Sequence, residues 1–169
     1  MNIPDQRALE TMAARLGTLL LANGQKMAAA ESCTGGWVAQ CLPAIAGSSE
    51  WFERGFVTYS NEAKQEMLGV PLETLISHGA VSEPTAAAMA CGALQHSHAD
   101  WTLAITGVAG PAGGSTDKPV GTVCFAWAGP NARCETQRCH FNGSREEVRA
   151  QSVAYALTGL LERASFLTA

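Results

Sequence analysis

The stretch from residue 26 to residue 37 reads Lys26-Met-Ala-Ala-Ala-Glu-Ser-Cys-Thr-Gly-Gly-Trp37 and passes from an apolar run into a polar turn. The pattern predicts a strand over residues 26–30 that breaks directly into a helix over residues 34–42. A strand that meets a helix in this way presents polar residues at the carboxyl edge of a sheet, where open α/β folds bind ligands. The amides at the start of the helix point to the same place. The turn therefore predicts a functional site in an α/β protein.

The hydroxyl groups of this turn are compatible with three roles. Ser32 can be a nucleophile or a phosphate ligand, and both Ser32 and Thr34 can simply cap the helix that follows, a common role of such residues. The turn is not a G-x-S-x-G elbow, so the hydrolase signature is absent. Cys33 is interpreted as a small buried core residue rather than as a nucleophile. The local pattern alone favours the cap.

Helix-like and strand-like segments alternate along the rest of the chain. Apolar residues recur at helical spacing over residues 4–22, and β-branched and aromatic residues mark a strand over residues 55–60. Further strands are expected over 101–106, 120–128 and 133–141, and further helices over 61–68, 72–77, 82–95 and 144–163. Because the last two strands follow one another through a Gly-Pro-Asn turn, we expect them to be antiparallel. The order predicts a mixed sheet between helical layers.

Composition narrows the class of protein. The chain has 169 residues, of which 47% are hydrophobic and 15% are charged, and this fits one globular domain over residues 1–169. The net charge of −4, without a lysine or arginine cluster, argues against nucleic acid as a partner. The six cysteines form no C-x-x-C pair, so we expect no metal site and reduced thiols in a cytoplasm. No apolar run reaches the ~20 residues that span a bilayer, so no membrane partner is expected.

A second polar cluster stands at the junction of the strand over 55–60 and the helix over 61–68. Tyr59, Ser60 and Lys64 together offer a phenol, a hydroxyl and an amine. A lone lysine at such a position is most simply an exposed helix charge. A lysine that faces a cleft can instead lose its proton through desolvation and act as a base. The residues alone leave both interpretations of Lys64 open.

The third cluster is the glycine-rich segment Thr106-Gly-Val-Ala-Gly-Pro-Ala-Gly-Gly-Ser115, within an expected loop that ends at Pro119. The amides of such a loop can wrap an anion. The spacing of a P-loop and the G-x-G-x-x-G fingerprint are both missing, so the phosphate signal is weak. A long irregular segment in a compact domain nevertheless more often serves a function than not.

Several of these segments stand together in one order along the chain. The sequence resembles the CinA C-terminal domain family, in the stand-alone form that acts as a nicotinamide-nucleotide amidase, over roughly residues 8–163. The segments that carry the resemblance are Ala30-Glu-Ser-Cys-Thr-Gly-Gly36, Gly55-Phe-Val-Thr-Tyr-Ser-Asn-Glu-Ala-Lys64, His78-Gly-Ala-Val-Ser-Glu-Pro84, Thr106-Gly-Val-Ala-Gly-Pro-Ala-Gly-Gly114 and Lys118-Pro-Val-Gly-Thr-Val123. Several long motifs in register are far more specific than any one of them.

The resemblance implies a three-layer α/β/α fold with a mixed, mainly parallel sheet. It implies an amidohydrolase that converts nicotinamide mononucleotide into nicotinate mononucleotide and ammonia, in NAD recycling. It also implies a homodimer that uses neither a metal nor an organic cofactor. The expected partners are thus the small nucleotide substrate and a second copy of the chain.

The resemblance further implies roles for individual residues. Ser32 matches the nucleophile, and a neutral Lys64 would accept its proton directly or through Tyr59. Thr106, where the family often has a serine, and nearby amides would hold the developing oxyanion. Thr34 is then left with the capping role. The residues expected to bind substrate are Glu31, which would hold Lys64 or a ribose hydroxyl, and, for the 5′-phosphate, Gly107, Gly110, Gly113, Gly114 and Arg145.

An alternative from another class is a non-catalytic nucleotide-binding or interaction module with the same fold. A degenerate domain of this kind should have lost Ser32, Tyr59 or Lys64, and all three are present. Another alternative keeps the catalysis but changes the substrate to a different pyridine nucleotide or small amide.

Overall fold

Five strands form one mixed sheet in the computed structural model, which describes residues 3–166. The strands are β1 (Met27–Glu31), β2 (Phe52–Val57), β3 (Trp101–Gly107), β4 (Thr122–Gly129) and β5 (Arg133–His140). Their order is β2-β1-β3-β4-β5. β1 is parallel to β2 and β3, whereas β4 is antiparallel to β3 and β5. Four of the five strands therefore run in one direction, and the late antiparallel pair is confirmed.

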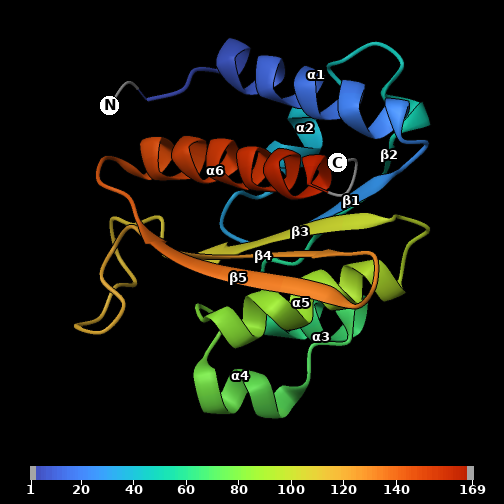
Figure 1. Cartoon of the computed structure of the whole chain (residues 1–169). Coiled ribbons are helices and arrows are strands. Elements are labelled where there is room, and N and C mark those ends of the chain that lie inside the picture. Colours follow the sequence, from blue (N-terminus) through green and yellow to red (C-terminus); the bar gives the residue numbers. More distant parts are fainter. Residues whose placement is uncertain (1–2, 167–169) are drawn as a thin grey trace.

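Helices cover both faces of this sheet (Figure 1). The helices are α1 (Gln6–Ala22), α2 (Trp37–Cys41), α3 (Asn61–Leu68), α4 (Leu72–His78), α5 (Glu83–Gln95) and α6 (Arg145–Ser165), with a short 3₁₀ turn, η1, at Ser48–Glu50. One layer is made of α1, α2 and α6, and the other of α3, α4 and α5. The predicted three-layer α/β/α class is confirmed. No helix within residues 3–166 is long and apolar enough to cross a membrane.

The sheet separates two hydrophobic cores, because successive side chains of a strand point to opposite faces. In β1, Met27 and Ala29 belong to the core under α1, α2 and α6, whereas Ala28 and Ala30 belong to the core under α3, α4 and α5. The second core is lined by alanines on β1, β3 and β4, so α5 can approach the sheet closely. This alternation decides which face each side chain at the strand ends will occupy.

Two elements differ from the sequence prediction by three residues, whereas the others differ by one or two residues at most. The strand predicted over 55–60 lies at Phe52–Val57, because Ser60 already caps α3 by accepting a hydrogen bond from the amide of Ala63 at 3.0 Å. The helix predicted over 34–42 begins only at Trp37, because Gly35 (φ 60°) and Gly36 (φ 96°) have left-handed backbone that cannot continue into a helix. Residues 32–36 therefore form an irregular turn in front of a short helix.

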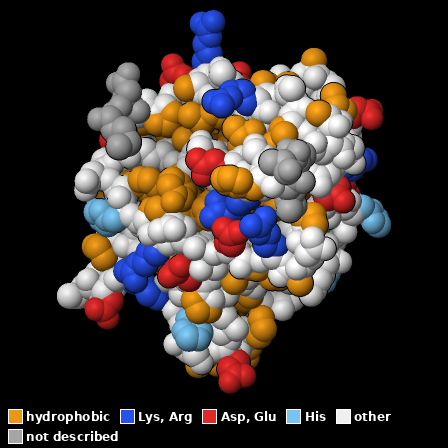
Figure 2. Space-filling view, viewed as in Figure 1, with side chains coloured by type: hydrophobic (Ala, Val, Ile, Leu, Met, Phe, Trp, Pro, Cys, Tyr) orange, Lys and Arg blue, Asp and Glu red, His pale blue; other side chains and the backbone are white. Residues whose placement is uncertain are grey.

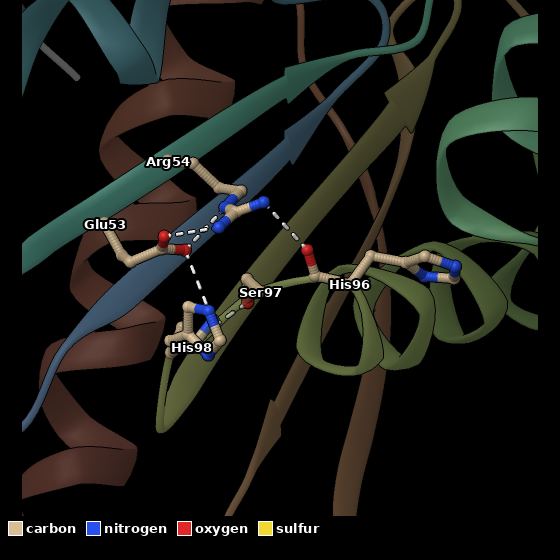
Figure 3. A network of polar contacts seen from close by, with 6 residues as sticks. Glu53, Arg54, His96, Ser97 and His98 are labelled. Atoms are coloured by element: carbon tan, nitrogen blue, oxygen red, sulfur yellow. Dashed lines mark hydrogen bonds and ion pairs between the residues drawn. The ribbon is translucent and has the colours of Figure 1, made fainter.

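A polar network ties the start of β2 to the loop between α5 and β3 (Figure 3). Glu53 forms a bidentate ion pair with Arg54 and also accepts from the amide of His98, and Arg54 donates to the carbonyl of His96 at 3.1 Å. The Arg54 side chain is partly exposed, so we expect the pair to order the loop more than it stabilises the fold. The network lies at the amino ends of the parallel strands, away from the turn after β1.

Charged side chains on the outer strand β5 protect it from pairing with another chain. Arg133 and Glu135 form an ion pair at 3.2 Å, and Arg163 of α6 binds the same carboxylate at 3.0 Å. The side chains of both signs are interspersed over the face that carries β5 and α6 (Figure 2). Charged residues on an edge strand oppose edge-to-edge pairing with another chain.

Candidate active site

Three hydroxyl residues lie side by side at the carboxyl ends of the parallel strands. Glu31 is in register with Val57 and Ile105, so the next residues, Ser32, Thr58 and Thr106, form a row across the sheet. The amide of Ser32 donates to the carbonyl of Ile105 at 2.9 Å, and that of Thr58 to the carbonyl of Glu31 at 2.8 Å. In each case, the residue two positions earlier belongs to the core under α3, α4 and α5. The row therefore faces that helical layer.

The topology makes this edge a place for a ligand. β2 lies on one flank of β1 in the sheet, and β3 lies on the other flank. The chain connects β1 to β2 through α2, and it connects β2 to β3 through α3, α4 and α5. The carboxyl end of β1 is thus the point at which the connections diverge, where open α/β sheets bind their ligands.

Lys64 reaches this row from α3. The side chain is buried, with 1% of the residue exposed, and its Nζ lies 3.0 Å from Ser32 Oγ and 2.9 Å from the carbonyl oxygen of Thr58. Burial lowers the pKa of Lys64, because surroundings of low dielectric disfavour the ammonium form. Ser32 itself retains 8% exposure. A serine hydroxyl next to an amine that readily loses its proton is an arrangement suited to nucleophilic attack.

Cys33 points away from this row, into the core under α1, α2 and α6. Burial raises the pKa of its thiol to about 12. The thiol therefore stays protonated at neutral pH and is a poor nucleophile. The expectation that Cys33 is a core residue is confirmed.

Glu31 supports the turn from inside. Its carboxylate accepts hydrogen bonds from the amides of Val38 at 2.9 Å and Ala39 at 3.0 Å, which are the first free donors of α2. Burial raises the pKa of Glu31, and these amide bonds oppose the rise. The N-cap of α2 is Gly36, so the prediction that Thr34 caps this helix is wrong. The capping task belongs to the carboxylate at the end of β1.

A cleft of about 250 Å³ opens beside the Ser32 hydroxyl. At its mouth, Arg145 donates to the hydroxyl of Tyr59 at 3.0 Å and to the carbonyl of Gly110 at 2.8 Å. Tyr59 is 64% exposed there. The cleft is lined by Ser32, Cys33, Tyr59, Asn61, Lys64, Ala80, Val81, Thr106, Gly107, Ala109 and Arg145.

The structure thus brings together six of the ten residues singled out from the sequence: Ser32, Tyr59, Lys64, Thr106, Gly107 and Arg145. Gly110 touches the cleft through Arg145, and Glu31 lies behind the turn. Gly113 and Gly114 are exposed and do not line the cleft. Thr106 donates its hydroxyl hydrogen to the carbonyl of Ala80 at 2.7 Å.

Sequence reasoning missed two residues near this site. Asn61 lines the cleft from the first turn of α3. Arg149 binds the turn that carries Ser32 from the opposite side. The only sequence signal for Arg149 is its place four residues after Arg145, on the same side of a helix. Within residues 3–166, no group of three or more His, Cys, Asp or Glu side chains is placed to hold a metal ion.

Fold and site together define an α/β protein with a buried serine–lysine pair at the carboxyl edge of its parallel strands. The model of the CinA C-terminal domain matches residues 9–164, so the chain belongs to the CinA C-terminal domain family.

Relatives and solved structures agree with this assignment. The chain is 54% identical over 155 residues to "Nicotinamide-nucleotide amidohydrolase PncC" of Escherichia coli strain K12, covering 92% of this chain and 94% of that protein. The protein of the same name from Pseudomonas putida is 48% identical over 154 residues, with 91% and 96% covered. The crystal structure of the competence/damage inducible protein CihA from Agrobacterium tumefaciens superimposes with a TM-score of 0.90 at 44% identity, covering 96% of this chain and 98% of that one.

Proposed function

We propose that this protein is an amidohydrolase that cleaves the carboxamide of nicotinamide mononucleotide and releases nicotinate mononucleotide and ammonia. The observation that carries the proposal is the 3.0 Å distance between Lys64 Nζ and Ser32 Oγ at the wall of a cleft. The printed name of the relatives, nicotinamide-nucleotide amidohydrolase, supports the choice of substrate.

In the first half of the reaction, the oxygen of Ser32 attacks the carboxamide carbon while neutral Lys64 takes the hydroxyl proton. The tetrahedral intermediate then breaks its C–N bond, and the ammonium of Lys64 returns the proton to the leaving nitrogen. Ammonia departs and an ester joins the nicotinoyl group to Ser32. Burial lowers the pKa of Lys64 and this supports its role as a base, because the neutral amine is present at lower pH than for an exposed lysine.

In the second half, a water molecule attacks the ester carbon while Lys64 takes a proton from that water. The bond to Ser32 Oγ breaks, Lys64 returns the proton to the serine oxygen, and the product leaves as the carboxylic acid, whose remaining proton passes to the released ammonia. One water is consumed for each ammonia released, and both residues return to their starting states.

The geometry favours direct transfer between Ser32 and Lys64 over a path through Tyr59. Lys64 is within hydrogen-bond distance of the serine, whereas the hydroxyl of Tyr59 binds Arg145 at the exposed mouth. We therefore assign Tyr59 to the positioning of substrate and of Arg145. The hydrogen of Thr106 is engaged by Ala80, so a backbone amide is a better oxyanion donor than this hydroxyl.

Arg145 is the cation of the cleft mouth that suits a 5′-phosphate. Its guanidinium lies between Tyr59 and Gly110, and a phosphate could replace either neutral acceptor with a charge-assisted bond. The neighbouring glycine-rich backbone, beginning at Gly107, would add amide donors.

The rival function is a nucleotide-binding module without turnover. Purified protein is incubated with nicotinamide mononucleotide, and ammonia and nicotinate mononucleotide are measured together. We expect both products in equal amounts. Binding of the nucleotide without release of ammonia at high protein concentration would support the module. Turnover only of another amide would keep the enzyme and change its substrate.

We also propose that the protein works as a homodimer in NAD recycling in a cytoplasm, with no metal or organic cofactor. The six cysteines are all unpaired, which supports a reducing compartment. Light scattering should give twice the monomer mass, and a monomeric result would contradict the homodimer.

A further inference from the structure

The turn between β1 and α2 is held from behind by a single side chain of α6. Arg149 donates through Nε to the carbonyl of Cys33 at 3.1 Å and through Nη2 to the carbonyl of Thr34 at 2.8 Å. Its guanidinium also stacks over the ring of Trp37, 5.2 Å from the centroid. The planar fork of an arginine can hold two neighbouring acceptors at once, which a lysine cannot do.

Apart from the Glu31 carboxylate, which holds the start of α2, few bonds fix the shape of the turn. Within it, the amide of Gly35 donates to the carbonyl of Ser32 at 3.0 Å, and the amide of Trp37 donates to the carbonyl of Thr34 at 3.2 Å. Gly35 and Gly36 are left-handed, and glycine gives a segment more conformational freedom than any other residue. The two bonds from Arg149 therefore restrain the least constrained part of the chain next to the nucleophile.

Holding the carbonyls also fixes the direction of the amides. A peptide group is planar and trans, so its N–H points opposite to its C=O. The N–H of a peptide belongs to the residue after its carbonyl, so the bond from Arg149 to the Thr34 carbonyl orients the Gly35 amide. That amide donates to the carbonyl of Ser32 at 3.0 Å and so orients the peptide whose N–H is that of Cys33. Cys33 lines the cleft beside Ser32, and its amide follows the nucleophile directly.

We propose that Arg149 is a positioning residue, which holds this turn so that the Cys33 amide faces the cleft and donates to the oxyanion formed on Ser32. The inference rests on the proposed amidohydrolase function. Arg149 lies on the reverse side of the turn and does not line the cleft, so it is expected to act on the rate of acylation and not on the binding of substrate.

A second hollow offers a direct way to test this role. It has a volume of about 1170 Å³, lies between the N-terminal parts of α1, α2 and α6, and is lined by Gly35, Trp37 and Arg149 among others. The space left by an Arg149→Ala substitution would open into this hollow, so free guanidinium could enter and replace the missing group.

The experiment compares Arg149→Ala with Arg163→Ala. Arg163 is a matched control, because it is also on α6, stacks over Trp127 at 3.9 Å and donates to the carbonyl of Gly159, but lies near the other end of the helix. We expect Arg149→Ala to lower kcat roughly 10- to 100-fold, less than deletion of an oxyanion donor, because the amide is misaimed but not removed. KM should change by less than about 3-fold, as for an interaction made only in the transition state.

Guanidinium, at concentrations that leave the unfolding temperature unchanged, should restore part of the lost kcat in Arg149→Ala and nothing in Arg163→Ala. Sodium chloride at the same ionic strength should not restore it. Equal kcat in the two variants overturns the proposal. A fall in kcat that guanidinium leaves unchanged also overturns it, because the loss then reflects general damage to the fold.

Labelling of Ser32 by a fluorophosphonate separates this inference from the proposed function. Its rate, followed by intact mass, needs the nucleophile and the oxyanion donor but no nucleotide. If the wild type labels but releases no ammonia from nicotinamide mononucleotide, the proposed substrate fails, and slower labelling of Arg149→Ala than of Arg163→Ala still supports the positioning role. Equal labelling rates, or no labelling of the wild type, overturn it.

Discussion

At the scale of single residues, the proposed chemistry depends on a lysine placed where it does not readily carry a charge. Lys64 is buried on α3, and its ammonium would have only the Ser32 hydroxyl and the Thr58 carbonyl as partners among the described residues. No carboxylate contributes to its pKa, and burial is the largest cause of the shift. The amine is thus prepared to lose a proton before substrate arrives.

Arg145 is expected to recognise the phosphate rather than the reacting amide. Substitution of Arg145 by Met should raise KM for nicotinamide mononucleotide by about 10-fold or more, since one charge-assisted pair at a partly exposed site contributes on the order of 1.5–3 kcal/mol. The measurement compares the nucleotide with nicotinamide riboside, which lacks the phosphate. The preference of the wild type for the nucleotide should shrink in the variant. An unchanged preference would place the phosphate elsewhere.

Residues that belong to a family motif could be assigned to the site from the sequence, whereas residues that act through long-range contacts could not. Ser32, Lys64, Tyr59 and Arg145 could be assigned through the family pattern, and the structure places all four around one cleft. The role of Glu31 as a helix cap could not be predicted, because it depends on where α2 begins. Arg149 acts on carbonyls more than a hundred positions away in the sequence, and no local pattern reports such a contact.

At the scale of elements, we expect the position of Lys64 to depend on how closely α5 packs against α3. A Cβ at Gly92 of α5 would lie 1.9 Å from the carbonyl oxygen of Leu68, the last residue of α3. We expect Gly92→Ala to lower the free energy of unfolding by about 1–3 kcal/mol, because backbone must move to make room. Displacement of α3 should also lower kcat. Urea denaturation and ammonia release measure the two effects.

Gly24→Ala provides the control for that prediction. Gly24, unlike Gly92, has a left-handed backbone, with φ 63°, and a Cβ there meets nothing within 4 Å. Gly24→Ala should lower the free energy of unfolding by about 1–2 kcal/mol through backbone strain and leave kcat unchanged. If Gly92→Ala keeps the kcat of the wild type, the packing of α5 does not set the position of Lys64.

The elements themselves were predicted well where periodicity was long and poorly where the chain turns. The long helices α1 and α6 follow the predicted ranges closely. The errors in β2 and α2 both lie beside the site, where Ser60, Gly35 and Gly36 end one element before the next begins. There the local propensity yields to the geometry that exposes Ser32.

At the scale of the whole molecule, the buried Lys64 should make stability depend on pH. Its pKa in the folded state is below the value of 10.5 for the free side chain, so between these two values the unfolded chain binds more protons. The free energy of unfolding contributed by Lys64 should therefore rise with pH across that window, and be lowest where both states are protonated.

Lys64→Met should lack this dependence. The difference in unfolding free energy between wild type and variant, measured by urea denaturation from neutral pH up toward 10.5, should change in favour of the wild type as pH rises. The buried cysteines titrate in both proteins, so their contribution cancels in the difference. A difference that stays constant with pH would mean that burial does not lower the pKa of Lys64.

The central claim is that Ser32 attacks the amide with Lys64 as its base. It is tested most directly by the rate of ammonia release from nicotinamide mononucleotide by Ser32→Ala, with calorimetric binding of nicotinate mononucleotide as the check that the variant is folded. The account predicts that Ser32→Ala binds the product as the wild type does and releases ammonia at least ~1000-fold more slowly. Near-normal release of ammonia by this variant would contradict the account.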